Sequence, residues 1–485
     1  MIYNKLKYFL KKDCCYFIPK KSSGKMSGGK ILRTFYTLFL LLIFLLSEVN
    51  AQSVTIIGDS LKGKAINGKS IREVIGNVVI TKEKTKITCN RAIQYLADDI
   101  AELLGNVIVT QDSVIIKTEK GRYLSKQELT ISDTTVTLKN KKVNLIADKG
   151  RYNTETKIAE FFGNVHFNDS VTVLTSDTLI YFKEEEKIIA VGNVEVADST
   201  TIIKADSLVH FRKTKLTTGY GNVSIINEKN KLSIFGNEFL DDKKNKITKI
   251  TGNPFLIKVE KQNNGKLDTL FIQSKILQAK KDSGNILIAI DSVTINRGDF
   301  SSVNDYTIYN KSNGQITILK KNENSTPVLW YENSQITGDS IYISLDSNKV
   351  KNVEIFNEAL LISMDSIYID RYNQMSGDTI MMNFRNGKLS ETKVIGNVLS
   401  IYYMYEDKEP NGLLKSSAKK IKIEFENNKV TDVKMYGSPM SEYHPEKLVN
   451  GNEKGFTLPS FYLYGNRPDK FLMKRRLKNK LTSVK

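Results

Sequence analysis

The sequence predicts an all-β fold built from repeats. A Gly-Asn-Val unit returns along the chain with glycine spacings of 29, 58, 29 and 29 residues, at Gly76, Gly105, Gly163, Gly192 and Gly221. After each Gly-Asn pair, apolar residues recur at every second position, as in a strand with one buried face. No apolar stripe of helical period persists after residue 51. A period of this size is typical of stacked or serially wrapped units.

Each copy is expected to place a tight turn at Gly-Asn and a strand behind it, because both residues tolerate positive φ. One copy is missing at position 134, where Thr134-Thr135 keeps the strand and loses the turn. Two apolar columns follow the turns and are predicted to point inward. The first column is Val78, Val107, Val136, Val165, Val194 and Val223, and the second is Ile80, Val109, Leu138, Phe167, Val196 and Ile225.

A second strand in each unit is marked by aromatic or polar residues at the same period, namely Tyr123, Tyr152, Tyr181 and His210. Four residues before each of these stand Glu119, Asp148, Asp177 and Asp206. A third apolar run, such as residues 188–191, leads into the next Gly-Asn. Three short strands in 29 residues fit a sandwich, a barrel or a solenoid.

The 485-residue chain has 72 basic and 53 acidic side chains, a net charge of +19. Residues 1–51 and 466–485 carry most of this excess, so the charge does not indicate a nucleic-acid partner. Residues 1–51 are predicted to be a signal peptide with a long basic n-region, because a twelve-residue apolar run precedes Val49-Asn50-Ala51. Cleavage is expected after Ala51, and either Met1 or Met26 is the initiator.

The rest of the chain is divided by the regularity of its repeats. Residues 52–260 form the regular repeat domain, and residues 261–330 are an irregular β continuation. Residues 331–450 are a second β domain with longer repeats, and residues 451–485 are a basic tail. No cofactor or metal site is predicted, because the three histidines are scattered and no metal-binding spacing is present. The acidic column is interpreted as capping of turns or strand ends in preference to a shared cation.

The Gly-Asn-Val strands, with Ala147-Asp148 and Tyr152, Ser176-Asp177 and Tyr181, and Ala205-Asp206 between them, resemble the OstA-like (organic-solvent-tolerance) family. Periplasmic lipopolysaccharide-transport proteins of the LptA type belong to that family. The resemblance covers residues 54–260 well. It implies an open antiparallel β-jelly-roll, a "β-taco", and the later repeats suggest two such domains in series.

The resemblance also implies a non-enzymatic function with no catalytic residues. A periplasmic carrier would bind the acyl chains of lipopolysaccharide, through lipid A, between the twelve residues of the two columns. Its expected partners are the inner-membrane lipopolysaccharide exporter and outer-membrane translocon components, with head-to-tail self-association as a further contact. The expected location is the periplasm, where association with the outer membrane is compatible with this role.

Two alternatives stay open at the level of sequence. The columns could fill a closed core, because the same pattern fits a closed sandwich and a splayed one. The chain could instead be an exported structural β-solenoid, an adhesin or scaffold, since three strands in 29 residues also fit a β-helix rung. A polysaccharide-active enzyme on a β-solenoid has the weakest support, because it would need clustered acids beside aromatic platforms.

Overall fold

The computed structural model describes residues 54–140, 143–261, 267–281, 285–346, 349–365, 367–407, 409–426, 429–469, 473 and 475. The predicted signal peptide, with the apolar run that defines it, lies outside these residues. Among the described residues, no helix is long and apolar enough to cross a membrane.

The first half of the described chain consists of strands, with one 3₁₀ turn, η1 (Ser125–Gln127). The strands are β1 (Thr55–Ile57), β2 (Ser60–Ile66), β3 (Lys69–Lys82), β4 (Thr85–Tyr95), β5 (Ile100–Gln111), β6 (Val114–Leu124), β7 (Leu129–Ser132), β8 (Val136–Asn140), β9 (Val143–Ala147), β10 (Lys149–Asn153), β11 (Ile158–Asn168), β12 (Val173–Phe182), β13 (Lys187–Ala197), β14 (Thr201–Phe211), β15 (Leu216–Asn227) and β16 (Leu232–Asp242).

The second half continues with sixteen more strands, followed by α3 (Glu446–Val449) and η2 (Glu453–Gly455). The strands are β17 (Ile247–Thr251), β18 (Phe255–Lys261), β19 (Leu267–Gln273), β20 (Ile276–Lys280), β21 (Ile286–Arg297), β22 (Phe300–Asn310), β23 (Gln315–Leu319), β24 (Val328–Tyr331), β25 (Ser334–Thr337), β26 (Ser340–Asp346), β27 (Lys349–Met364), β28 (Tyr372–Arg385), β29 (Lys388–Glu406), β30 (Glu409–Glu426), β31 (Lys429–Tyr436) and β32 (Met440–His444).

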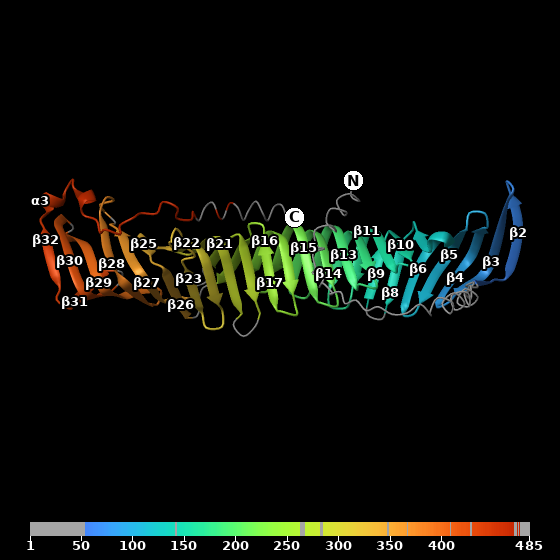
Figure 1. The fold of residues 1–485 in the computed structure, drawn as a ribbon, viewed down its shortest axis with the longest axis horizontal. Helices are drawn as coiled ribbons and strands as arrows, with labels where there is room; N and C mark the ends of the chain where they lie inside the picture. The colour runs from blue at the N-terminus through green and yellow to red at the C-terminus, as the bar shows by residue number, and fades with distance from the viewer. Residues whose placement is uncertain are drawn as a thin grey trace, which may run out of the picture. The chain divides into compact units, whose positions relative to one another are not determined.

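The described strands form one hydrogen-bonded sheet, in which neighbours follow one another along the chain (Figure 1). From β11 to β16 each strand pairs antiparallel with the next. All the other pairings between described strands are also antiparallel, as in β3 with β4 and β29 with β30. The predicted all-β, repeat-built antiparallel fold is therefore confirmed. A parallel β-helix, the architecture behind the scaffold alternative, is wrong for these residues.

The Gly-Asn pairs lie inside the strands, so the expected tight turn is wrong. Between β11 and β12 the register passes from Phe162↔Thr178 to Val165↔Ser176, which leaves Gly163 and Asn164 opposite one residue of the partner. Two residues opposite one make a β-bulge, which bends and twists a strand without ending it. The apolar runs before and after each Gly-Asn are therefore one bent strand, and a 29-residue unit contains two strands instead of three.

The bulges fold the sheet so that its inner face packs against itself. Phe161 and Val165 lie on either side of the bulge in β11, and both belong to one buried cluster. Ile355 and Ala359 in β27 share another cluster in the same way. Side chains at opposite strand ends also meet, since Tyr152 near the end of β10 donates to Gln111 at the end of β5 on the other side of the bulges. The fold thus has two layers made from a single bent sheet.

The acidic column predicted as a cap stabilises these bulges. Gly163 and Asn164 have φ values of 73° and 43°, in the left-handed region that glycine and asparagine tolerate best. Asn164 Nδ2 donates to Asp148 Oδ2 at 2.8 Å, and a Cβ on Gly163 would lie 2.5 Å from that same oxygen. The same Asn–Asp pairing recurs at the bulges of Gly192 and Gly221. Each aspartate therefore bonds the asparagine and leaves no room for a side chain at the glycine.

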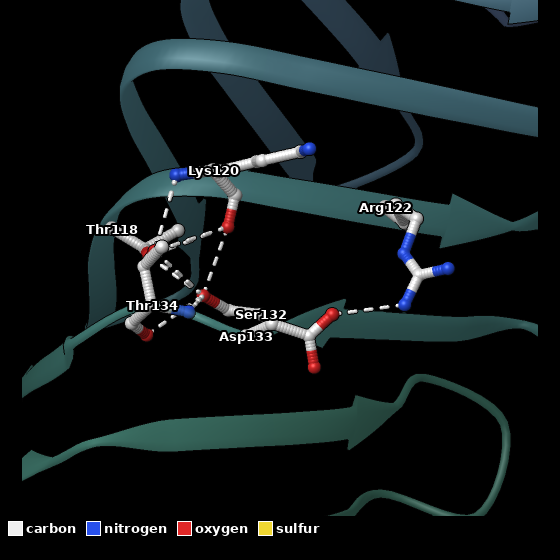
Figure 2. Close-up of polar contacts among 6 residues, drawn as sticks. All are labelled: Thr118, Lys120, Arg122, Ser132, Asp133 and Thr134. Carbon is white, nitrogen blue, oxygen red and sulfur yellow. Dashed lines mark hydrogen bonds and ion pairs between the residues drawn. The ribbon is translucent and has the colours of Figure 1, made fainter.

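Where the repeat lacks Gly-Asn, the bent strand is broken into β7 and β8, which both pair with β6. Hydrogen bonds from hydroxyl groups connect the strands at this position, as Figure 2 shows. Thr118 Oγ1 lies 2.7 Å from Ser132 Oγ and 2.8 Å from Thr134 Oγ1. Ser132 Oγ also donates to the carbonyl oxygen of Lys120 at 2.9 Å. Thr118, Ser132 and Thr134 thus hold the sheet together here by side-chain hydrogen bonds instead of by a bulge.

The sheet continues through the predicted domain boundaries. β17 pairs with β20, β19 with β21 and β23 with β26, so pairing crosses residues 261–330 without interruption in the described part. The described residues of Val54–Lys485 form one compact unit. The division into domains at 260, 330 and 450 stays a prediction from the loss and return of the repeat.

Residues 446–464, here called the C-terminal strap, run back over the sheet past β28 and β25 (Figure 1). Gln374 on β28 donates to the carbonyl oxygen of Phe456 and accepts from the amide of Leu458, at 3.1 and 2.7 Å. Gln335 on β25 makes the same pair of bonds with residues 462 and 464, at 2.7 and 2.8 Å. The first part of the predicted basic tail is therefore bonded to the sheet.

Candidate functional site

The first predicted column forms the floor between the two layers. All six valines are buried, and all six belong to clusters with neighbours from the same face. Val136 and Val165, for example, pack with Phe161 and Leu179. Side chains with this degree of burial are covered by protein, so the first column is core and offers no open surface.

The second column lies nearer the opening of the fold. All six of its members are partly buried and pack against the clusters that contain the first column. The two inward columns therefore differ in depth, a difference that their shared apolar character did not reveal. The residue between the two columns points to the opposite face of the strand, and it is exposed at His166, whereas Ser224 at the equivalent position is buried.

A cavity of about 100 Å³ lies on the inner face between β5 and β14. Its apolar wall includes three second-column residues from successive copies, Val109, Leu138 and Phe167. The other apolar lining residues come from neighbouring strands: Val114, Ile116, Val143, Leu145, Ala159, Phe161, Leu179 and Ile188. The structure thus brings part of the predicted second column to a cavity, while none of the first column lines it.

Polar residues surround this apolar wall at the ends of the strands. Gln111, Asn140, Tyr152, Tyr181, Lys157, Lys183 and Arg212 line that part of the cavity. Tyr152 donates through its hydroxyl to Gln111 Oε1 at 3.1 Å, and burial raises the pKa of this phenol. The cavity therefore has an apolar body and a mouth with three cationic side chains.

Part of this lining is periodic in the sequence, although the periodicity alone does not identify these residues as lining a cavity. Tyr152 and Tyr181 belong to the periodic column that marked the second strand, and Ile188 opens the third apolar run. Because the bulge joins the third run to the next copy, its residues face the same space as the second column. Lys157, Lys183 and Arg212 stand at or next to hairpin turns, where charged residues are ordinary and give no signal.

No catalytic constellation appears among the described residues. No group of three or more His, Cys, Asp or Glu side chains there could hold a metal ion. Cys89 is buried, and burial raises the pKa of its thiol, the opposite of what an attacking thiolate needs. Burial also lowers the pKa of His210, whose Nδ1 lies 3.0 Å from Thr217 Oγ1.

Comparison with known proteins gives one family match. Residues 53–197 match the sequence profile of the family described as OstA-like protein. No curated protein matches the chain. One solved structure that matches is LptH from Pseudomonas aeruginosa, described as the LptA-homologous periplasmic component of the conserved lipopolysaccharide transport device. The match has 16% sequence identity and a TM-score of 0.21, and it covers 23% of this chain and 83% of that one.

Proposed function

Because residues 53–197 are an OstA-like region, we propose that this chain is a non-enzymatic lipid carrier of lipopolysaccharide transport. It binds acyl chains of lipopolysaccharide on the inner face of the bent sheet and passes them toward the outer membrane. The matched region contains most of the strands that line the cavity, from Val109 on β5 to Ile188 on β13.

The observation that carries this proposal is the amphipathic cavity. Its wall is built from aliphatic and aromatic side chains, and transfer of hydrocarbon from water to such a surface is worth about 0.8 kcal/mol per CH₂. Because Val109, Leu138 and Phe167 come from successive repeats, they form a row along the sheet. An extended acyl chain needs such a row more than it needs a deep round pocket.

The cationic mouth supports the choice of an anionic lipid. Lys157, Lys183 and Arg212 stand at the polar side of the cavity, where the head group of a bound lipid would lie. Charge-assisted hydrogen bonds from lysine or arginine to phosphate are short and strong. Lipid A combines several acyl chains with phosphate groups, which matches both parts of this cavity.

A carrier of this kind works between two membranes. We propose that the leader is cleaved after Ala51 and that the mature chain acts in the periplasm. It would receive lipid from the inner-membrane exporter and deliver it to outer-membrane translocon components, alone or through head-to-tail copies of itself. Edman or mass-spectrometric reading of the mature N-terminus, together with fractionation of the cell envelope, tests the location.

Site-specific photo-crosslinking tests the binding itself. An unnatural photoreactive residue at Phe167 faces the cavity, and one at His166, the next residue of β11, is exposed on the other face. The proposal expects lipopolysaccharide adducts at position 167 and at Leu138, and none at 166. Equal adducts at 166 and 167, or none at either cavity position, would contradict it.

A further inference from the structure

The bent sheet has two rows of strand ends that come together at the cavity mouth. One row, here called the first lip, contains the hairpin turns at residues 83–84, 112–113, 169–172 and 198–200. The other, the second lip, contains the connections at 96–99, 125–128, 154–157, 183–186 and 212–215. Because antiparallel strands alternate in direction, connections alternate between the two lips along the chain.

Three side-chain contacts join the first lip to the second. Lys82 Nζ lies 2.8 Å from Glu128 Oε1, Tyr152 donates to Gln111 at 3.1 Å, and Lys183 Nζ lies 3.6 Å from Asp112 Oδ2. The members of each pair lie between 41 and 71 positions apart along the chain. They meet only because the bulges fold the sheet.

Two of the three contacts, Tyr152 with Gln111 and Lys183 with Asp112, span the mouth of the cavity itself, whereas Lys82 and Glu128 lie outside its lining. Gln111, Tyr152 and Lys183 all line it, and Asp112 directly follows the end of β5. Asp112 and Lys183 are about half exposed, and Lys82 and Glu128 are also open to solvent in part. Ion pairs this exposed contribute roughly 0–1 kcal/mol each. The pairs therefore hold the lips together weakly enough to be exchanged.

We propose that the two contacts at the mouth form a clasp that closes it and opens when an anionic lipid takes the place of Asp112 on Lys183. This inference rests on the proposed function, since it states which lipids can enter the same cavity. The neighbouring cations Lys157 and Arg212 stand beside Lys183 at the mouth. A phosphate there gains several donors, whereas a neutral lipid gains none and leaves the clasp closed.

Competition at Lys183 follows from charge and coordination. A carboxylate and a phosphate bind the same ammonium group, but a phosphate carries more charge and more acceptor oxygens. Lys157 is itself bonded to Glu184 at 2.6 Å, so an entering phosphate meets cations that already have partners. Binding is therefore an exchange of anions, and it should weaken as salt screens both sets of pairs.

Accessibility of the cavity can be measured without any lipid. In a Val109→Cys variant, the introduced thiol lines the cavity, and its reaction rate with a maleimide can be followed by peptide mass spectrometry, which separates it from the native cysteines. Adding Asp112→Lys places two cations across the mouth. The rate should rise about two- to fivefold, the factor that corresponds to loss of one exposed ion pair.

Two further variants make this result specific. Exchanging the pair, Asp112→Lys with Lys183→Asp, should return the rate to that of Val109→Cys alone. Glu155→Lys changes the charge of an exposed second-lip turn residue by the same amount and should leave the rate unchanged. A rate unaffected by Asp112→Lys, or equally raised by Glu155→Lys, overturns the clasp.

The lipid requirement is tested on the same thiol. Lipid A in detergent should protect the Val109→Cys thiol from the maleimide, and dephosphorylated lipid A should protect it several-fold less. Equal protection by both overturns the exchange at Lys183 and leaves the carrier function supported. No protection by either contradicts the carrier function, while the labelling rates above still decide whether the clasp exists.

Discussion

The molecule contains two regions whose strands are bent by β-bulges in the same way. One region encloses a cavity, and the other has a filled core. Strands β5–β14 surround the cavity, whereas strands β22–β30 surround the largest buried cluster among the described residues. Both regions bend their strands at bulges that contain residues with positive φ. In the second region Ile341, Val353, Ile355 and Ile380 have no exposed surface at all. The bend therefore sets the fold, and the side chains on the inner face decide whether the space is filled.

The lips of the two regions also close differently. Those of the cavity region meet through polar pairs such as Lys183 and Asp112. In the second region, Phe384 meets Tyr331 edge-on, with 5.5 Å between the ring centroids, and Phe300, the cross-strand partner of Tyr331, stacks on Tyr331 at 4.5 Å. Aromatic contacts exclude water and resist exchange by a charged ligand. The two regions therefore differ in a testable way: the cavity region keeps space between its layers and has polar pairs at its lips, whereas the second region is filled and has aromatic contacts there.

The largest difference is expected from truncations on the two inner faces. Ile355→Ala in the filled region should lower the free energy of unfolding by about 2–5 kcal/mol, because it leaves a cavity among fully buried neighbours. Leu138→Ala beside the existing cavity should cost less than half as much, since its side chain is partly exposed. Urea unfolding followed by circular dichroism measures both. Equal losses would show that the two interiors are packed alike.

Substitution of the bulge glycines should affect both regions to the same degree. Gly163→Ala and Gly396→Ala each put a Cβ on a residue with φ above 70° and against an aspartate. Each should cost roughly 1–3 kcal/mol. Gly63→Ala is the matched control, because no atom lies within 4 Å of the added Cβ. Thermal unfolding of the three variants measures these losses. If Gly396→Ala left the melting temperature unchanged, the requirement for glycine at the bulge would apply only to the first region.

The smallest effect is expected from a charge in the second region. Hydrogen bonds from Lys393 hold the pKa of Glu391 down to about 2, below the ordinary 4.5, and Asn383 and Lys422 also bond it. A depressed pKa stabilises the fold above about pH 4.5, and this contribution disappears as the pH falls toward 2. Glu391→Gln should therefore be less stable than the parent at pH 7 and equal to it near pH 2. Glu426→Gln, at an exposed position, should show no such pH-dependent difference.

Much of the fold could be predicted from the sequence, because every copy of the repeat has the same alternation of apolar and polar residues. Val165 and Phe167 lie on one inward face, as predicted, since successive side chains of a strand point to opposite faces. Their different depths depend on how sharply the strand bends, which the apolar pattern does not encode. Gly163 and Asn164 tolerate positive φ in a hairpin turn and in a bulge alike, so the pair alone could not separate the two.

The remaining features depend on residues far apart in the chain. The cross-lip pair Lys183 and Asp112 involves ordinary turn residues in different hairpins. Gln374 and Gln335 bind backbone groups of the strap more than 80 positions later, so only the folded chain brings them together. A local sequence pattern cannot predict contacts between residues that only the folded sheet brings together.

The strap also sets an order of assembly. Val449 and Leu458 complete the buried cluster over Leu360, Ile362 and Tyr403, yet they follow all the described strands of the sheet in the chain. The early hairpins can form from local contacts as soon as they emerge, whereas the outer surface of β25 and β28 stays uncovered until the strap has been made. A chain interrupted before residue 446 would carry a folded cavity region beside an apolar surface that nothing covers, and such a surface promotes aggregation.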